Sequence, residues 1–207
     1  MKPWLFDILA CPIDKNFPLK LYIFSFENEN KEFQSILNTY ENRNINFIKN
    51  EKIIEITHKE DDFFIKDNVI HEKTRIKSYL ELINSSLIEF ENVFDNSTNL
   101  FSKKCFEVMN SKVKLCIKKF SENPDFDQLE NILPELFLIN QIKLDFEINS
   151  GILFCSECKR WYPIIDTIPQ MLPDKYRDEK KDTEFLKNHK NLLDEKFFIQ
   201  DLKPFKI

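Results

Sequence analysis

The chain has 207 residues and a net charge of −5, from 35 acidic and 30 basic residues, and 42% of its residues are hydrophobic. This length and composition exclude a chain that is disordered throughout and leave room for one large domain or two small ones. The acidic balance weighs against a free-standing nucleic-acid binder, because such proteins are usually basic.

The chain contains one glycine, Gly151. Dinucleotide-binding and P-loop motifs need several glycines for close backbone approach to phosphates, so both are excluded. A nucleotide cofactor, where one takes part, is therefore expected on a partner protein.

The N-terminal stretch MKPWLFDILACP holds too short an apolar run for a signal peptide, and no stretch reaches the 18 apolar residues of a membrane span. Five cysteines without a secretory signal predict a reducing compartment and free thiols or thiolates. We therefore expect a cytoplasmic protein with no membrane contact.

Residues 3–9 predict a short helix with a proline in its first turn, and residues 19–24 predict a strand that is apolar on both faces. From residue 27 to residue 140 the patterns are mostly helical. Four amphipathic helices are expected there. The first carries Phe33, Ile36, Leu37 and Tyr40, and the second runs from Ile76 to Phe90. The third runs from Leu100 to Phe120, and the fourth carries Phe126, Leu129, Ile132 and Leu133. Residues 52–57 and 62–65 fit either short strands or loop.

Strand patterns return after the helical segment. Residues 141–148 alternate, 149–151 predict a turn, and 152–154 lead into the cysteine pair. Residues 161–165 and 168–172 predict strands joined by a turn at Asp166 and Thr167. A last helix is expected to begin with Asp182 or Thr183 as its cap.

These patterns predict an α+β fold. Both chain ends, 1–26 plus 141–180, would form a small zinc-ribbon-like β-rich domain. A mostly helical domain, 27–140, would be inserted between them, and 181–207 would form a C-terminal helix and tail.

The cysteine pattern indicates a metal site divided between the two ends. Cys155 and Cys158 have the spacing of one half of a zinc knuckle, and Cys11 and Asp14 repeat that spacing near the N-terminus. Three sulfurs and a carboxylate can hold zinc. The alternative is that zinc has been lost, with Asp14 capping its turn or pairing with Lys15 while the thiols pack in the reduced state.

No catalytic residues are predicted. The histidines, His58, His71 and His189, stand near no cysteine or serine in a recognisable pattern. Cys105 and Cys116 lie 11 residues apart on one predicted helix, which favours a place in its core over a ligand role.

Two motifs carry a resemblance to a known family. LFDILACP at 5–12 and GILFCSECKRWYPIIDTIPQMLP at 151–173 resemble the tRNA methyltransferase 112 family, in particular long, archaeal-type members with a helical insertion. Two positions depart from that pattern. Asp14 replaces a cysteine, and Thr167 stands where a glycine is usual.

The resemblance implies a non-catalytic activator subunit that forms a heterodimer with class I methyltransferases. Family members pair a strand with the methyltransferase sheet, cover an apolar patch on it and improve its binding of S-adenosylmethionine. The substrates of these enzymes include tRNA, rRNA and a translation release factor. S-adenosylmethionine would then be held only by the partner, and contact with RNA would be indirect or weak.

The residues themselves indicate where a partner would bind. The run after the cysteines is densely apolar, and its prolines suit an edge strand because proline lacks an N–H. The predicted partner-binding residues are Trp161, Ile164, Ile165, Ile168, Pro169, Met171 and Leu172. Alternatively, the insertion or the tail covers this edge.

Two rival functions remain at this stage. Lys159, Arg160 and the basic residues after them would suit a stand-alone nucleic-acid-binding zinc ribbon. The second rival function is an enzyme whose active site lies in the insertion, but residues 27–140 show no acid–base or nucleophile pattern.

Overall fold

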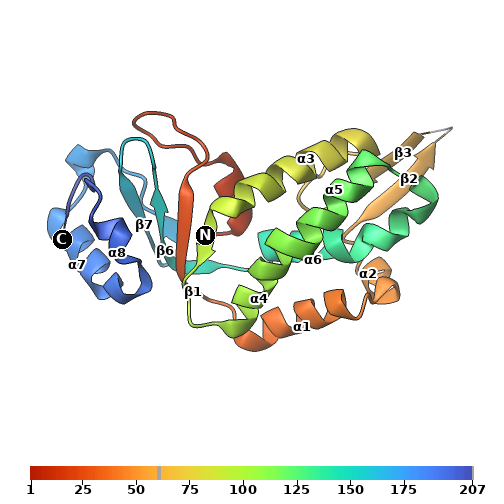
Figure 1. The fold of residues 1–207 in the computed structure, drawn as a ribbon, viewed down its shortest axis with the longest axis horizontal. Helices are drawn as coiled ribbons and strands as arrows, with labels where there is room; N and C mark the ends of the chain where they lie inside the picture. Colours follow the sequence, from red (N-terminus) through yellow and green to blue (C-terminus); the bar gives the residue numbers. More distant parts are fainter. Residues whose placement is uncertain (60–61, 207) are drawn as a thin grey trace. The chain divides into compact units, whose positions relative to one another are not determined.

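A computed structural model describes residues 1–59 and 62–206 of the chain. The chain divides into two compact units (Figure 1). The end unit comprises Met1–Glu27, Asn92–Asn99 and Glu147–Ile207, and the central unit comprises Asn28–Glu91 and Leu100–Phe146. The predicted α+β class is confirmed. The division differs from the predicted limits because residues 92–99 and the C-terminal segment belong to the end unit, while 141–146 belong to the central unit.

The end unit is built around one five-stranded sheet with the order β5-β1-β6-β7-β8. The strands are β1 (Lys20–Phe26), β5 (Val93–Asp95), β6 (Ile148–Phe154), β7 (Trp161–Ile165) and β8 (Ile168–Pro169), and a short 3-10 helix, η1 (Pro3–Ile8), precedes them. Strand β5 runs parallel to β1, and the other neighbours are antiparallel. The strands predicted at both ends of the chain therefore form one sheet.

The β7–β8 hairpin closes through Asp166 and Thr167, as predicted. Both residues have positive φ, 46° and 66°, which is the conformation that a two-residue hairpin turn requires. The strand predicted over 168–172 is shorter than expected, because β8 ends at Pro169.

Two predictions next to the cysteine pair were wrong. Residues 141–144 end helix α6 (Leu133–Leu144), because Ile142 and Phe146 are spaced for a helix as well as for an alternating strand, and both are buried. Gly151 lies inside β6 and has no positive φ. A Cβ atom there would lie 2.5 Å from the carbonyl oxygen of Tyr22, so glycine permits the close approach of β1 and does not form a turn.

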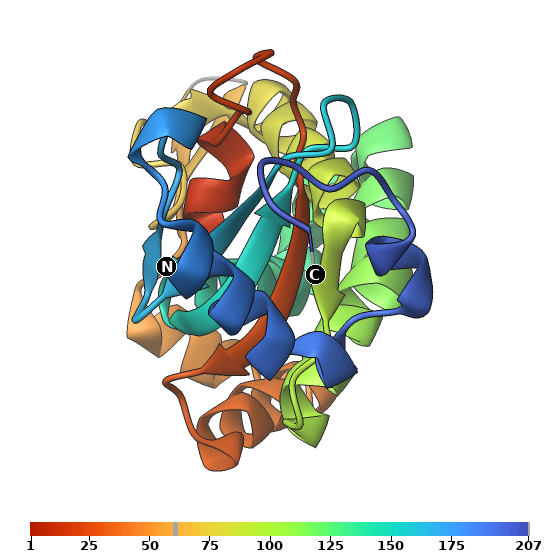
Figure 2. The same cartoon turned by 90° about the vertical axis from the view of Figure 1, so that its left-hand side faces the viewer.

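One face of the end-unit sheet is covered by the C-terminal segment, where α7 (Glu179–Asn188) crosses in front of the strands in Figure 2. The predicted cap was wrong, since Asp178 accepts from the backbone N–H groups of Lys180 and Lys181. With α8 (Glu195–Phe198) and the tail, α7 forms an apolar core on this face. Its buried members are Phe24, Ile152, Phe154, Trp161, Leu186, Leu193, Phe197 and Leu202.

The central unit is mostly helical. Its helices are α1 (Asn30–Glu41), α2 (Ile45–Glu51), α3 (Ile76–Glu89), α4 (Leu100–Val108), α5 (Lys114–Glu122) and α6, with a 3-10 segment, η4 (Phe126–Ile132), before α6. A π-helical segment, η3 (Met109–Val113), joins α4 to α5, so the helix predicted from Leu100 forms as one run. Cys105 on this run is buried and Cys116 is partly exposed.

The central unit also contains a small antiparallel sheet, β2-β3-β4. The strands are β2 (Glu55–Lys59), β3 (Asp62–Lys66) and β4 (Thr74–Arg75). Both segments that fitted either strand or loop are therefore strands. Over the described part of the chain, no helix is long and apolar enough to cross a membrane.

Candidate metal centre and sheet edge

The two knuckle segments, CPIDK and CSECK, fold into the same turn. The N–H of Lys15 donates to the carbonyl oxygen of Cys11 at 2.9 Å, and the N–H of Lys159 donates to that of Cys155 at 3.0 Å. Lys15 and Lys159 both take positive φ, 63° and 61°. Asp14 therefore occupies the place in its knuckle that Cys158 occupies in the other.

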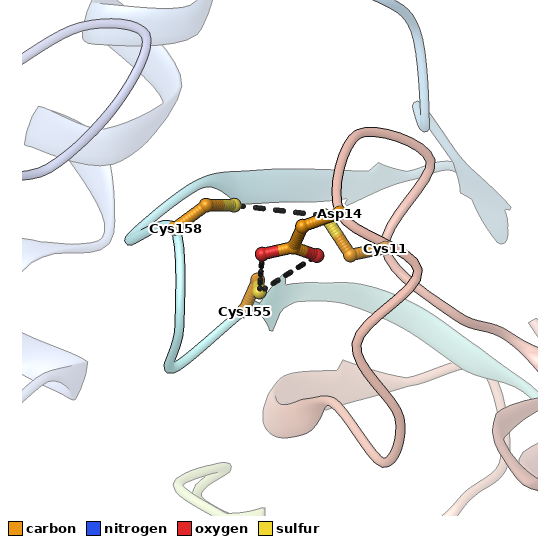
Figure 3. A group of neighbouring side chains, drawn as sticks. All are labelled: Cys11, Asp14, Cys155 and Cys158. Atoms are coloured by element: carbon orange, nitrogen blue, oxygen red, sulfur yellow. Dashed lines mark hydrogen bonds between the residues drawn. The ribbon is translucent and has the colours of Figure 1, made fainter.

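The four predicted ligands converge from these two loops (Figure 3). One ligand atom from each of Cys11, Asp14, Cys155 and Cys158 lies within 4.8 Å of the other three. The Cys11 and Cys158 sulfurs are 3.6 Å apart, and the Cys155 sulfur lies 3.3 Å from Asp14 Oδ2. Two ligands of one tetrahedral zinc ion, each about 2.3 Å from it, are about 3.8 Å apart. The spacing and chemistry of the four groups therefore fit zinc.

The protonation of these groups depends on their surroundings. Burial raises the pKa of the Cys11 thiol and raises the pKa of Cys155 to about 12. Hydrogen bonds from Cys11 and from the backbone N–H of Asn16 hold the pKa of the Asp14 carboxyl well below its usual range. The cluster thus combines a carboxylate with protonated thiols, and a bound cation would favour their thiolate forms.

Asp14 caps its turn in the way the alternative interpretation expects. Its Oδ1 accepts from the N–H of Asn16 at 3.0 Å, whereas the ammonium of Lys15 donates to the carbonyl oxygen of Pro12. Capping uses one carboxylate oxygen, while Oδ2 lies nearest to Cys155. Turn capping and metal binding by Asp14 are therefore compatible.

Strand β7 and the residue before it supply two further contacts to the sulfurs. The hydroxyl of Tyr162 lies 3.3 Å from the Cys11 sulfur, and burial followed by this hydrogen bond raises the pKa of Tyr162. Arg160 hydrogen-bonds to Asp174 and to Cys158, which raises the pKa of its guanidinium. Sequence reasoning did not assign Tyr162 to the site, because nothing in the motif shows which strand residue faces Cys11.

Strand β8 forms one edge of the end-unit sheet. Among the predicted partner-binding residues, Ile168 is 59% exposed and Leu172 is 43% exposed. Ile165, Pro169 and Met171 are half-buried. Trp161 and Ile164 are fully buried, so they belong to the core that supports the edge.

The edge of β7 is already closed by the chain itself. The N–H of Trp161 donates to the carbonyl oxygen of Lys203 in the tail, and the N–H of Gln170 donates to that of Pro163. The tail thus covers the start of β7. Strand β8 covers its end, so the side chains of β8 and of the residues after it remain on the outer edge.

The two arginines near the knuckles are paired with acidic residues. Arg160 pairs with Asp174 at 2.8 Å, and Arg177 pairs with Asp182 at 2.6 Å. These pairs reduce the positive charge that the region presents to phosphates.

Comparison with known proteins bears on the whole arrangement. No curated protein and no solved structure gave a significant match. A family model described as Trm112p-like protein matches residues 2–166, which include both knuckles and β7. The chain therefore belongs to the Trm112p-like family, a family of methyltransferase activators.

Proposed function

We propose that this protein is a non-catalytic subunit that binds, stabilises and activates class I methyltransferases acting on tRNA, rRNA or a translation release factor. The observation that carries the proposal is the edge patch, defined as Ile168, Pro169, Met171 and Leu172 at and after β8. Family membership supports the activator role in general, and the exposed apolar side chains of the patch support this edge as the place where a partner would bind.

An exposed apolar edge in an isolated chain promotes aggregation unless something covers it. Burying the exposed parts of Ile168 and Leu172 against a partner would contribute about 1–2 kcal/mol for each side chain. Trp161 and Ile164, which were predicted to bind the partner, would act indirectly by holding β7 in place behind the patch.

The partner strand would extend the sheet beyond β8 over a short length. Pro169 has no N–H, and the N–H of Met171 is bonded to the carbonyl oxygen of Pro169. Few ladder hydrogen bonds are therefore available on the outer side of β8. We infer that burial of the edge patch contributes more to the complex than strand pairing does.

The cofactor and metal expectations are consistent with a non-catalytic subunit. S-adenosylmethionine would be bound by the methyltransferase, because this chain has a single glycine and therefore no glycine-rich loop for a nucleotide cofactor. Zinc held by Cys11, Asp14, Cys155 and Cys158 would have a structural role, tying the two knuckles together. RNA contact would be indirect, and the complex would act in the cytoplasm beside its substrates.

The test is coexpression with the class I methyltransferases of the same cell, followed by purification on the tagged chain. The variant Ile168→Asp with Met171→Asp should lose its partner and leave that enzyme poorly soluble and weak in S-adenosylmethionine binding. Ile88→Asp is a matched control, because Ile88 is 56% exposed on α3 of the central unit. The control should retain the partner.

Two results would contradict the proposal. One is that no methyltransferase co-purifies with the unmodified chain. The other is that the double variant leaves every such enzyme soluble and active. Salt-sensitive RNA binding by the isolated chain would instead support the stand-alone nucleic-acid-binding function.

A further inference from the structure

Tyr162 is a buried tyrosine whose hydroxyl points at the candidate metal centre. Its side chain is fully buried, and its hydroxyl lies 3.3 Å from the Cys11 sulfur. Among the residues that the structure describes, Cys11 is its only hydrogen-bond partner. A buried hydroxyl that lacks an adequate hydrogen-bond partner costs about 1–3 kcal/mol of unfolding free energy. How well the Cys11 sulfur accepts a hydrogen bond therefore affects the stability of the end unit.

The Cys11 sulfur lies among the other candidate metal ligands. Besides the Tyr162 hydroxyl, its neighbours are the Cys158 sulfur at 3.6 Å and the Asp14 carboxylate, to which the Cys11 thiol donates. A neutral thiol is a weak acceptor, whereas a thiolate accepts strongly from several donors. A buried thiolate in turn needs a compensating cation. The hydrogen bond from the Tyr162 hydroxyl, 3.3 Å from the Cys11 sulfur, would therefore be strongest when Cys11 is a metal-bound thiolate.

We propose that Tyr162 is a positioning residue of the metal centre: its hydroxyl donates to the Cys11 thiolate, orients that sulfur toward the other three ligands and strengthens the binding of zinc. This role concerns metal retention and stands independently of methyltransferase activation. When zinc binds, the cysteine thiols release their protons to solvent and the Tyr162 hydroxyl keeps its own.

The strand register supports this role. Tyr162 pairs with Leu153 across the β6–β7 ladder, which fixes its position relative to Cys155, the residue directly after the end of β6. Its neighbour Trp161 pairs with Phe154 and packs in the core on the opposite face of the sheet. The hydroxyl is thus held by a rigid part of the end unit, and its removal should leave the strand in place.

Metal affinity measured on the full-length chain tests the proposal. Zinc is removed and then titrated back in competition with a chromophoric chelator. Tyr162→Phe removes only the hydroxyl and should weaken zinc binding by about 10- to 100-fold, as is typical of groups that hydrogen-bond to metal ligands. Tyr22→Phe on β1, in the same sheet, is the control and should change the affinity by less than about twofold.

A second set of measurements separates positioning from a general effect on folding. In a Cys11→Ala background, Tyr162→Phe should have no further effect on affinity, because the acceptor is gone. With cobalt as the probe metal, the sulfur-to-metal charge-transfer band should shift in Tyr162→Phe and not in Tyr22→Phe. The metal-free variants should unfold at the same temperature as metal-free wild type.

A measurement on the wild-type chain keeps the proposal testable where the variant does not fold. In the cadmium-113-loaded protein, nuclear magnetic resonance should show a Tyr162 hydroxyl proton that is protected from exchange and coupled to the metal. Three results would overturn the proposal: unchanged zinc affinity in Tyr162→Phe, an equal loss in the Cys11→Ala background, or no binding of zinc or cobalt by wild type.

Discussion

The two units of this protein are assembled from contacts of different kinds. In the end unit the Met1 ammonium donates to the carbonyl oxygen of Ile148, 147 residues away, and the Cys11 and Cys158 sulfurs meet across the same separation. In the central unit the sheet joins consecutive strands. Closing a long loop costs conformational entropy, so the end unit depends more on each contact that joins the chain ends.

The polar groups that the two units bury also differ. The central unit holds Asp67 in a network in which its carboxylate accepts from Tyr79 and Asn140. The end unit gathers sulfurs and a carboxylate that suit a cation. The central unit therefore satisfies this buried polar network internally, whereas the end unit brings together groups that could hold a metal ion.

Among the variants that test this difference between the units, Trp161→Ala is expected to have the largest effect on stability. Trp161 is fully buried in the end-unit core, and its truncation should cost about 3–5 kcal/mol of unfolding free energy. Hydrogen exchange should rise in β1, β6 and β7 while α4 and α5 keep their protection. Phe137→Ala, in the central-unit core, should raise hydrogen exchange in the central unit and leave β1, β6 and β7 protected. An equal loss of protection in both units would contradict the inferred difference between them.

Gly151→Ala is expected to have the next largest effect. The added Cβ atom would lie 2.5 Å from the carbonyl oxygen of Tyr22, and the backbone of β1 must shift to relieve it. We expect a loss of about 3 kcal/mol, measured by denaturant unfolding and confined to the end unit. An unchanged midpoint of denaturant unfolding would show that β1 and β6 can move apart without a loss of stability.

Tyr79→Phe probes the buried network of the central unit. The variant removes one donor to Asp67 and leaves the aromatic ring in place, which should cost about 1–2 kcal/mol. Zinc affinity should not change, because the end unit holds the metal ligands. A change in metal binding would contradict the separation of roles between the units.

The smallest predicted effect has the opposite sign. Thr167 has a φ of 66° in the β7–β8 turn, where a β-branched residue is strained. Thr167→Gly should raise the stability of the end unit by about 1 kcal/mol, seen as a higher unfolding midpoint. Glu29→Gly, exposed and at negative φ beside α1, is the control and should not stabilise the chain.

Much of the local structure could be predicted from residue patterns. The apolar spacing of Phe33, Leu37 and Tyr40 places α1, and the x-x spacing of each knuckle names all four members of the metal cluster. The strand prediction that failed concerns a segment that fits both a helical and an alternating pattern of apolar residues. Residues 141–148 alternate as a strand would, yet Ile142 and Phe146 also have helical spacing.

Residue patterns were enough to predict α1, α3 and the helical run from Leu100, the knuckle spacing and the family motifs, because these depend on residues close together in the chain. Long-range packing was needed to show that β5 joins the end unit, that Trp161 and Ile164 are buried, and that Tyr162 reaches Cys11. Each of these depends on strand register and on contacts between residues far apart in the chain, which a local pattern does not specify.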